Sequence, residues 1–291
     1  MYELIQAGDR SYFIESPAKI GVVLTEKNQV CLIDSGNDKS AGKKIKQILT
    51  RQGWHLAAIY NTHSHADHIG GNRYLQTQTG CPVYAPGIEL DFTRHPLLEP
   101  SFLYGANPPE DLRHKFLMAQ DSRAEELTNE VLPQGWEMIS LPGHSFDMVG
   151  FRSPDDVVYL ADCLSSRETL QKYQISFLVD VEAYLQTLEK VKTMEARLFI
   201  PSHAEPASEI AALAQVNIDK VHEIADRILA VCKEPKGTDQ IIKALFDAYS
   251  LVLTFEQYAL VGSTVRSYLA WLKDKGLVAA DFSSNMLVWR S

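Results

Sequence analysis

Three histidines and one aspartate lie within six consecutive positions of this 291-residue chain. They are His63, His65, Asp67 and His68. Imidazole nitrogens and carboxylate oxygens are the ligands that a borderline-soft divalent cation such as zinc prefers. A polar loop whose histidines cap a helix end is the alternative, but such a loop needs no comparable density of ligand side chains. The cluster therefore predicts a metal site.

The neighbouring elements indicate where this cluster lies. The apolar run from Leu56 to Tyr60 predicts a buried strand that ends just before it. Gly70 and Gly71 follow, and an amphipathic helix is expected over about residues 69–79. A strand-to-helix loop is where an open α/β sheet normally carries its functional site.

Three further ligand residues also come at the ends of predicted strands. His144 follows a strand on a glycine turn, Asp162 ends an apolar strand, and His203 ends another. A lone histidine in such a place is more often a cap or a core residue. Because carboxyl ends of neighbouring strands meet at one edge of a sheet, the coincidence of all these residues predicts one composite site.

Length and composition are typical of a globular protein with one sizeable domain and a smaller one: 45% of residues are hydrophobic and 22% are charged. The net charge of −9 disfavours a polyanionic partner. The amino terminus lacks a basic region followed by an apolar stretch, and no apolar run approaches membrane-spanning length. A cytoplasmic protein with no membrane partner is therefore expected. The four cysteines are expected to be buried free thiols.

Residues 87–132 form an irregular, aromatic-rich insertion between core elements. A segment this long is usually a lid, a binding loop or an interface. Some of its side chains suit a substrate with an apolar group and a negative end; they are Phe102, Tyr104, Arg113, His114 and Lys115. The alternative is that they pack the insertion onto its own domain or onto a second subunit.

After Pro206 the pattern changes to helices. Helices are expected at 216–232, 239–249 and 263–275, followed by two short strands around the turn 282–285. Three helices and a hairpin form the winged-helix pattern, which nucleic-acid binders and dimerisation modules share. We therefore expect a catalytic domain over 1–210 and a winged-helix-like domain over 211–291.

The ordered set of ligand residues resembles the metallo-β-lactamase fold superfamily over about residues 1–205, and glyoxalase II and related hydrolases are the most similar in ligand set. The resemblance implies a four-layer αββα fold with two divalent metal ions. Zinc is the default, and manganese and iron are alternatives. The first ion would be held by His63, His65 and His144, and the second by Asp67, His68 and His203, with Asp162 bridging both.

The same resemblance matches Asp34 to the family's early buried aspartate, which supports a ligand loop from behind; an ordinary turn aspartate is the alternative. Class B β-lactamases often use a cysteine in the second site, and Cys163 adjoins Asp162. Neighbours on a strand point to opposite faces, so we expect Asp162 to face the metals and Cys163 to pack in the core. The resemblance weakens beyond residue 205, where glyoxalase II carries a helical glutathione-binding segment.

The implied function is hydrolysis of a small ester, thioester or lactone by a metal-bridging hydroxide. The candidate catalytic residues are Asp67, which could orient the water or take its proton, and Asp34, which acts through the ligand loop. Iron-dependent oxidation of persulfides, the chemistry of one member of the superfamily, is an outlying alternative.

Two other functional classes remain as alternatives. A metal-dependent endoribonuclease is similar in layout, but residues 216–290 carry nine basic and nine acidic side chains and so offer no cationic excess. A non-catalytic metal sensor with a DNA-binding tail has no need of a bridging carboxylate. A neutral tail fits better as a homodimerisation element or as a wall over the active-site cleft.

Overall fold

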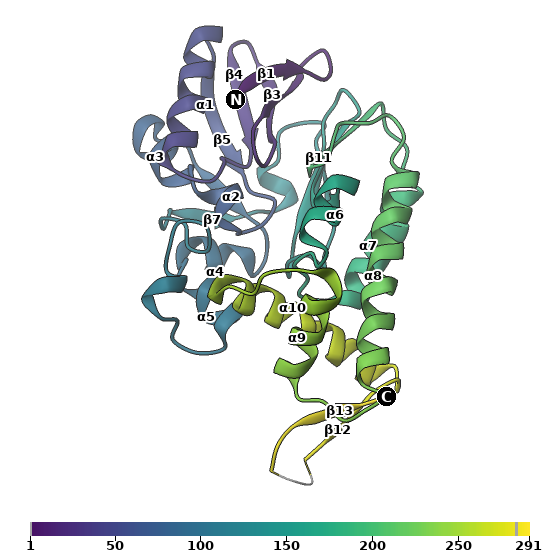
Figure 1. Cartoon of the computed structure of the whole chain (residues 1–291). Coiled ribbons are helices and arrows are strands. Elements are labelled where there is room, and N and C mark those ends of the chain that lie inside the picture. Colours follow the sequence, from purple (N-terminus) through teal and green to yellow (C-terminus); the bar gives the residue numbers. More distant parts are fainter. Residues whose placement is uncertain (1, 283–284) are drawn as a thin grey trace.

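Two β-sheets face each other at the centre of the molecule, as the computed structural model of residues 2–282 and 285–291 shows (Figure 1). The first sheet joins an antiparallel part, β1 to β4, to a parallel part, β4 to β7. Its strands, in spatial order, are β1 (Glu3–Gln6), β2 (Ser11–Glu15), β3 (Ile20–Glu26), β4 (Gln29–Ile33), β5 (His55–Tyr60), β6 (Val83–Ala85) and β7 (Ala124–Glu126).

The second sheet has the order β11-β10-β9-β8. Its strands are β8 (Glu137–Ser140), β9 (Val149–Arg152), β10 (Val157–Ser165) and β11 (Leu198–His203). Strands β8, β9 and β10 pair antiparallel, whereas β10 and β11 pair parallel. The parallel pair brings the carboxyl ends of β10 and β11 to the same edge. His203 ends β11 as the sequence predicts, whereas Asp162 lies within β10, which continues to Ser165.

Helices cover the outer face of each sheet (Figure 1). Helices α1 (Lys39–Gln52) and α3 (Asn72–Thr79) lie on the first sheet, and α7 (Val181–Lys192) and α8 (Ala211–Val231) lie on the second. Apolar residues fill three interfaces: first sheet with helices, sheet with sheet, and second sheet with helices. This four-layer αββα arrangement confirms the expected fold class.

The helix expected over residues 69–79 is in fact two helices, α2 (Ala66–Ile69) and α3. The chain between them packs closely on the segment that follows β4. A Cβ atom on Gly71 would lie 2.2 Å from the carbonyl oxygen of Ser35, and one on Gly70 would lie 2.3 Å from that of Asn37. Only glycine permits this approach, which fixes the ligand loop against the first sheet.

The insertion 87–132 packs on its own chain. It contains α4 (Glu89–Arg94), α5 (Leu98–Tyr104), two 3-10 turns (Glu110–Leu112 and Asn129–Val131) and β7, which extends the first sheet. Leu103, Leu112 and Leu117 form a small core with Ala259 of α10 (Phe255–Asp274). The insertion therefore joins the first sheet to the C-terminal helices, in agreement with the alternative that it packs onto its own domain.

The C-terminal region consists of α8, α9 (Thr238–Tyr249), α10 and the antiparallel pair β12 (Ala279–Asp281) and β13 (Val288–Arg290). Helix α10 begins at Phe255 rather than at 263, because Thr254 caps it by accepting a hydrogen bond from the Gln257 N–H. Residues 283–284 of the expected turn lie outside the described residues. None of the helices in the described chain has the long apolar stretch that a membrane span requires.

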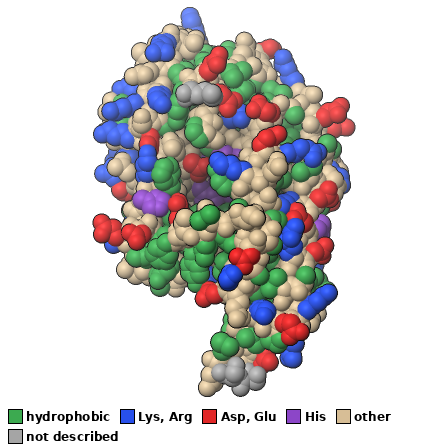
Figure 2. Space-filling view, in the orientation of Figure 1, with side chains coloured by type: hydrophobic (Ala, Val, Ile, Leu, Met, Phe, Trp, Pro, Cys, Tyr) green, Lys and Arg blue, Asp and Glu red, His purple; other side chains and the backbone are tan. Residues whose placement is uncertain are grey.

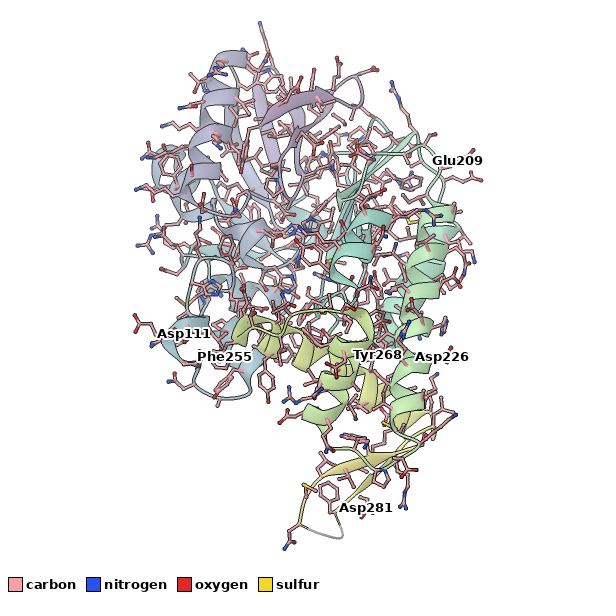
Figure 3. The ribbon with its side chains drawn as sticks, viewed as in Figure 1. Asp111, Glu209, Asp226, Phe255, Tyr268 and Asp281 are labelled. Carbon is pink, nitrogen blue, oxygen red and sulfur yellow. The ribbon has the colours of Figure 1, made fainter. Side chains whose placement is uncertain are left out.

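One apolar core runs from the second sheet through α7 and α8 to α9 and α10. Tyr268 of α10 is buried in it, beside α8 (Figure 3). The C-terminal helices and the second sheet thus pack into one continuous apolar core. The division at residue 210 and the winged-helix assignment stay predictions.

Candidate metal centre

Five histidines and two aspartates meet where the strands of both sheets end, at the base of a hollow in which histidine side chains are visible (Figure 2). They come from the loop after β5, the short helix α2, the β8–β9 loop, β10 and β11. The structure thus brings together every residue that the sequence proposes as a metal ligand. They form two groups of four: His63, His65, His144 and Asp162, and Asp67, His68, Asp162 and His203.

In the first group, three ring nitrogens surround one point. Nε2 of His63 and Nε2 of His144 each lie 3.0 Å from Nδ1 of His65. Asp162 Oδ2 lies 3.5 Å from the His144 nitrogen and 3.9 Å from the His63 nitrogen. Zinc binds such atoms at about 2.0–2.2 Å in a tetrahedron, so donors with these separations can share one ion.

The donor atoms of the second group are also close to one another. His203 Nε2 is 3.1 Å from Asp162 Oδ2 and 3.4 Å from Asp67 Oδ2. His68 Nε2 is 3.1 Å from Asp162 Oδ1 and 3.7 Å from Asp67 Oδ2. Asp162 is the residue common to both groups, as a bridging carboxylate would be.

Two atoms of the second group show that it suits a cation. His68 Nε2 and Asp162 Oδ1 are fully buried, face each other, and have no hydrogen-bond partner of suitable geometry. Unpaired buried polar atoms are costly in a folded protein, and a metal ion is one of the groups that satisfies them. The donor set therefore fits a divalent ion.

The ring nitrogens that face away from the site are also held. His63 Nδ1 lies 3.0 Å from Thr62 Oγ1, and His68 Nδ1 lies 2.8 Å from Asp34 Oδ2. Backbone carbonyls of Phe177 and Pro17 hold Nδ1 of His144 and of His203, respectively. Such outer partners fix the ring orientation and the tautomer of metal-binding histidines.

Asp34 is placed behind the second group rather than in the hollow. Its side chain accepts hydrogen bonds from the backbone N–H and the hydroxyl of Thr62 and contacts His68 Nδ1, and the residue is 2% exposed. Its backbone is left-handed, with φ 65°. Aspartate is tolerated in this conformation, and strained residues of this kind cluster at functional sites. Asp34 therefore contacts both the residue before His63 and the ring of His68, and its role as a support of the ligand loop stays a prediction.

An irregularity in β10 directs Asp162 toward the site. The register with β11 shifts on both sides of Ala161, whose φ is 51°. A bulge of this kind re-aims the side chains that follow it. Cys163, the next residue, is fully buried in the core of the second sheet.

The two groups differ in the charge state of their histidines. Burial, together with neighbouring imidazoles, lowers the pKa of His144 to about 3. Burial also lowers the pKa of His65 to about 4 and lowers that of His63 well below its usual value. In the second group burial also lowers the pKa, but the neighbouring carboxylates Asp162 and Asp67 together outweigh it. They raise the pKa of His203 to about 10 and that of His68 well above its usual value. In the metal-free protein at pH 7 the three histidines of the first group are therefore neutral, whereas His203 of the second group is protonated.

Metal binding at neutral pH should consequently release protons from the histidines of the second group, in addition to any from a bridging water, but none from the histidines of the first group. Ligation requires neutral imidazoles, so filling that group should release at least the proton of His203, and its affinity should fall as the pH falls. Titration calorimetry of the metal-free protein with Zn²⁺ at pH 7, in buffers of different ionisation enthalpy, measures the number of protons released. His203→Ala should reduce it by about one. Release that is unchanged in this variant would contradict the assignment.

A cavity of about 630 Å³ opens onto the metal-binding residues. Asp67, His144, Asp162 and His203 form its base. Its other walls come from α6 (Arg167–Tyr173), the segment after it and α10, and include Lys172, Tyr173, Ile175, Phe177, Leu260 and Val261. The proposed substrate residues of the insertion do not line this cavity: Lys115, for example, pairs with Asp38, and His114 contacts Glu256.

Sequence reasoning missed two buried glutamates of the insertion. Glu89 hydrogen-bonds to the loops that carry His63, His65 and His144. Glu99 Oε1 lies 3.6 Å from the outward nitrogen of His65, and burial, with repulsion from Glu89 and Asp67, raises the pKa of Glu99 to about 8. Neither residue belongs to a motif, and no local pattern in an irregular segment distinguishes them from surface glutamates.

A family model, that of the metallo-beta-lactamase superfamily, matches residues 17–203, which include all seven metal-binding candidates. The chain belongs to the metallo-β-lactamase superfamily. Its members are metal-dependent, and the chain is a hydrolase of this superfamily.

Two curated relatives within the superfamily are hydrolases. The chain is 26% identical to the probable metallo-hydrolase YflN of Bacillus subtilis, over 67% of this chain and 80% of that protein. It is 24% identical to a hydroxyacylglutathione hydrolase of Methylococcus capsulatus, over 69% of this chain and 70% of that protein. At these identities the relatives indicate the hydrolase class rather than a particular substrate.

Two solved structures share the fold over almost the entire chain. A β-lactamase domain protein from Burkholderia ambifaria has a TM-score of 0.75 and covers 99% of this chain and 93% of its own. A metallo-β-lactamase family protein from Thermus thermophilus has a TM-score of 0.74, with coverages of 100% and 98%. Both are 16% identical, so they show the fold alone. The shared fold includes the C-terminal helices of this superfamily member.

Proposed function

We propose that this protein is a dinuclear metal-dependent hydrolase of a small carboxyl ester, thioester or lactone. The observation that carries the proposal is Asp162, which belongs to both donor groups and lies at the base of the cavity. Two bound divalent ions would lower the pKa of a shared water and polarise the carbonyl under attack. Zinc is the expected metal because the donors are imidazole and carboxylate.

The residues around the cavity would bind and orient the substrate. Asp67 lines the cavity and its side chain is 41% exposed. Burial would raise its pKa, but His68 and His203 lower the pKa well below the usual value, so its carboxylate stays ionised. An ionised Asp67 can accept a hydrogen bond from the attacking water and orient it toward the substrate.

The cavity favours a small acyl substrate over a nucleic acid. Apolar side chains of Phe177, Leu260 and Val261 offer contact area to an acyl group. Among the described residues that line it, Lys172 is the one lysine or arginine, whereas Asp67, Asp162 and Glu168 are acidic. A phosphodiester backbone needs clustered cations, which these walls do not provide.

Hydrolysis should depend on bound metal and should prefer carboxyl substrates. The protein, purified without added metal, would be analysed for metal content and assayed with a chromogenic thioester, an aryl ester, a lactone and bis(p-nitrophenyl) phosphate. We expect about two zinc ions per chain, turnover of carboxyl substrates, loss of turnover after chelation and recovery on adding Zn²⁺.

Each other outcome points to a different function. Turnover of the phosphodiester alone would replace the proposal with the nuclease alternative. One iron per chain without hydrolysis would replace it with the oxidative alternative. The screen is run at pH 7 and pH 8, and metal content is measured on the same samples. This measurement separates a poor substrate from a missing ion.

A further inference from the structure

The insertion 87–132 contributes a buried glutamate to the metal centre. Glu89 begins α4, is 1% exposed, and has a carboxyl group that lies between two loops from different sheets. One loop follows β5 and carries His63 and His65; the other joins β8 to β9 and carries His144. These three histidines are the ring donors of the first group.

Each oxygen of Glu89 holds one of these loops. Oε2 accepts hydrogen bonds from the Ser64 backbone N–H at 3.0 Å and from the Ser64 hydroxyl at 2.5 Å. Oε1 accepts from the Ser145 hydroxyl at 2.7 Å and from the Asp147 backbone N–H at 3.2 Å. Ser64 lies between two ligand histidines, and Ser145 directly follows the third.

The connection between the insertion and the second loop is reciprocal. Asp147 Oδ2 accepts a hydrogen bond of 2.8 Å from the backbone N–H of Ile88, the residue before Glu89. The β8–β9 loop is thus held to α4 at two points. The Glu89 carboxyl group accepts four hydrogen bonds, all from the two ligand loops, and so constrains the distance between these two loops.

We propose that Glu89 is a positioning residue that holds the His63–His65 loop and the His144 loop at the separation one metal ion requires. It acts on the first donor group and not on the second, whose outer partners are Asp34 and the carbonyl of Pro17. The inference rests on the metal centre of the proposed function, but it concerns binding of the ion and not the identity of the substrate.

Glu89→Gln is the sharpest test because it keeps the shape of the side chain. An amide has one acceptor oxygen, so its NH₂ group must face the backbone N–H of either Ser64 or Asp147. One loop would then lose its anchor. Outer partners of this kind are worth about 10–100-fold in metal affinity. We expect Glu89→Gln to weaken the binding of one of the two ions by that factor and to leave the binding of the other unchanged.

The measurement is competition of metal-free protein with a chromophoric chelator for Zn²⁺, which reports both affinities. Glu89→Gln should weaken the same ion's affinity as His144→Ala, which removes a ligand of the first group. It should differ in this respect from His203→Ala, which removes a ligand of the second group. Ser145→Ala removes a single hydrogen bond and is the substitute test if Glu89→Gln does not fold. It should lower the affinity for the same ion by a smaller factor. In the Glu89→Gln background, Ser145→Ala should add little.

Ile45→Ala is the control for general loss of stability, since Ile45 belongs to α1 and is fully buried in the core between α1 and the first sheet, which includes none of the metal-binding candidates. Equal weakening of both ions in Glu89→Gln and in Ile45→Ala would overturn the proposal in favour of a merely structural role. Unchanged affinities in Glu89→Gln and Ser145→Ala would also overturn it. Wild-type protein that binds two ions but hydrolyses none of the substrates refutes the proposed function alone. Wild-type protein that binds no ion refutes both.

Discussion

Asp162→Asn is expected to lower kcat/KM by about a thousandfold or more, roughly 4 kcal/mol of transition-state stabilisation. The substitution keeps the size of the side chain but removes the charge that both donor groups share. It also turns an amide NH₂ toward either His68 or His203, whose nitrogens each lie 3.1 Å from the carboxylate. Metal content should fall from about two ions per chain to one or fewer. Steady-state kinetics and elemental analysis of the same preparation measure both effects.

Cys163→Ala is the matched control for this variant. Cys163 adjoins Asp162 but is fully buried in the core of the second sheet, on the opposite side of β10. Its removal should cost stability, as a small cavity does, and should leave both ions bound. The ligand assignment would be reversed if Cys163→Ala lost metal while Asp162→Asn retained it.

Asp34→Ala should destabilise the protein by roughly 3 kcal/mol or more and weaken the second metal ion by about 10–100-fold. The change leaves the Thr62 N–H, the Thr62 hydroxyl and His68 Nδ1 without their buried acceptor. It also places alanine at φ 65°, where aspartate is better tolerated. Urea unfolding of the metal-free protein gives the stability, and chelator competition gives the affinity.

Asp38→Ala provides the comparison for Asp34→Ala. Asp38 is a nearby aspartate that caps α1 by accepting hydrogen bonds from the N–H groups of Ser40 and Ala41. Loss of an N-cap costs about 1 kcal/mol and should not change metal affinity. If both variants lowered stability alone, Asp34 would be an ordinary turn residue.

Local sequence was sufficient for strands such as β5 and for the residues that meet near the strand ends, but not for β7, which lies in the insertion described as irregular. Apolar runs such as Leu56–Tyr60 specify buried strands whatever surrounds them, and ligand-type side chains directly after several strands are rare unless a site uses them. The same locality explains the error at residues 69–79. Helical periodicity continues across Gly70 and Gly71, and the break is imposed by carbonyl groups more than thirty residues earlier in the chain.

The sequence by itself determined the set of seven ligand candidates, because residue type and strand ends are local properties. Their order implied the αββα fold class through its resemblance to a known superfamily. The tertiary structure alone decided which ring nitrogens face the site, because outer partners such as Asp34 and the Phe177 carbonyl hold the opposite nitrogens. It also decided that α10 walls the cavity and that Glu89 joins two ligand loops. Those contacts connect distant segments of irregular sequence, and no period or motif within one segment encodes them.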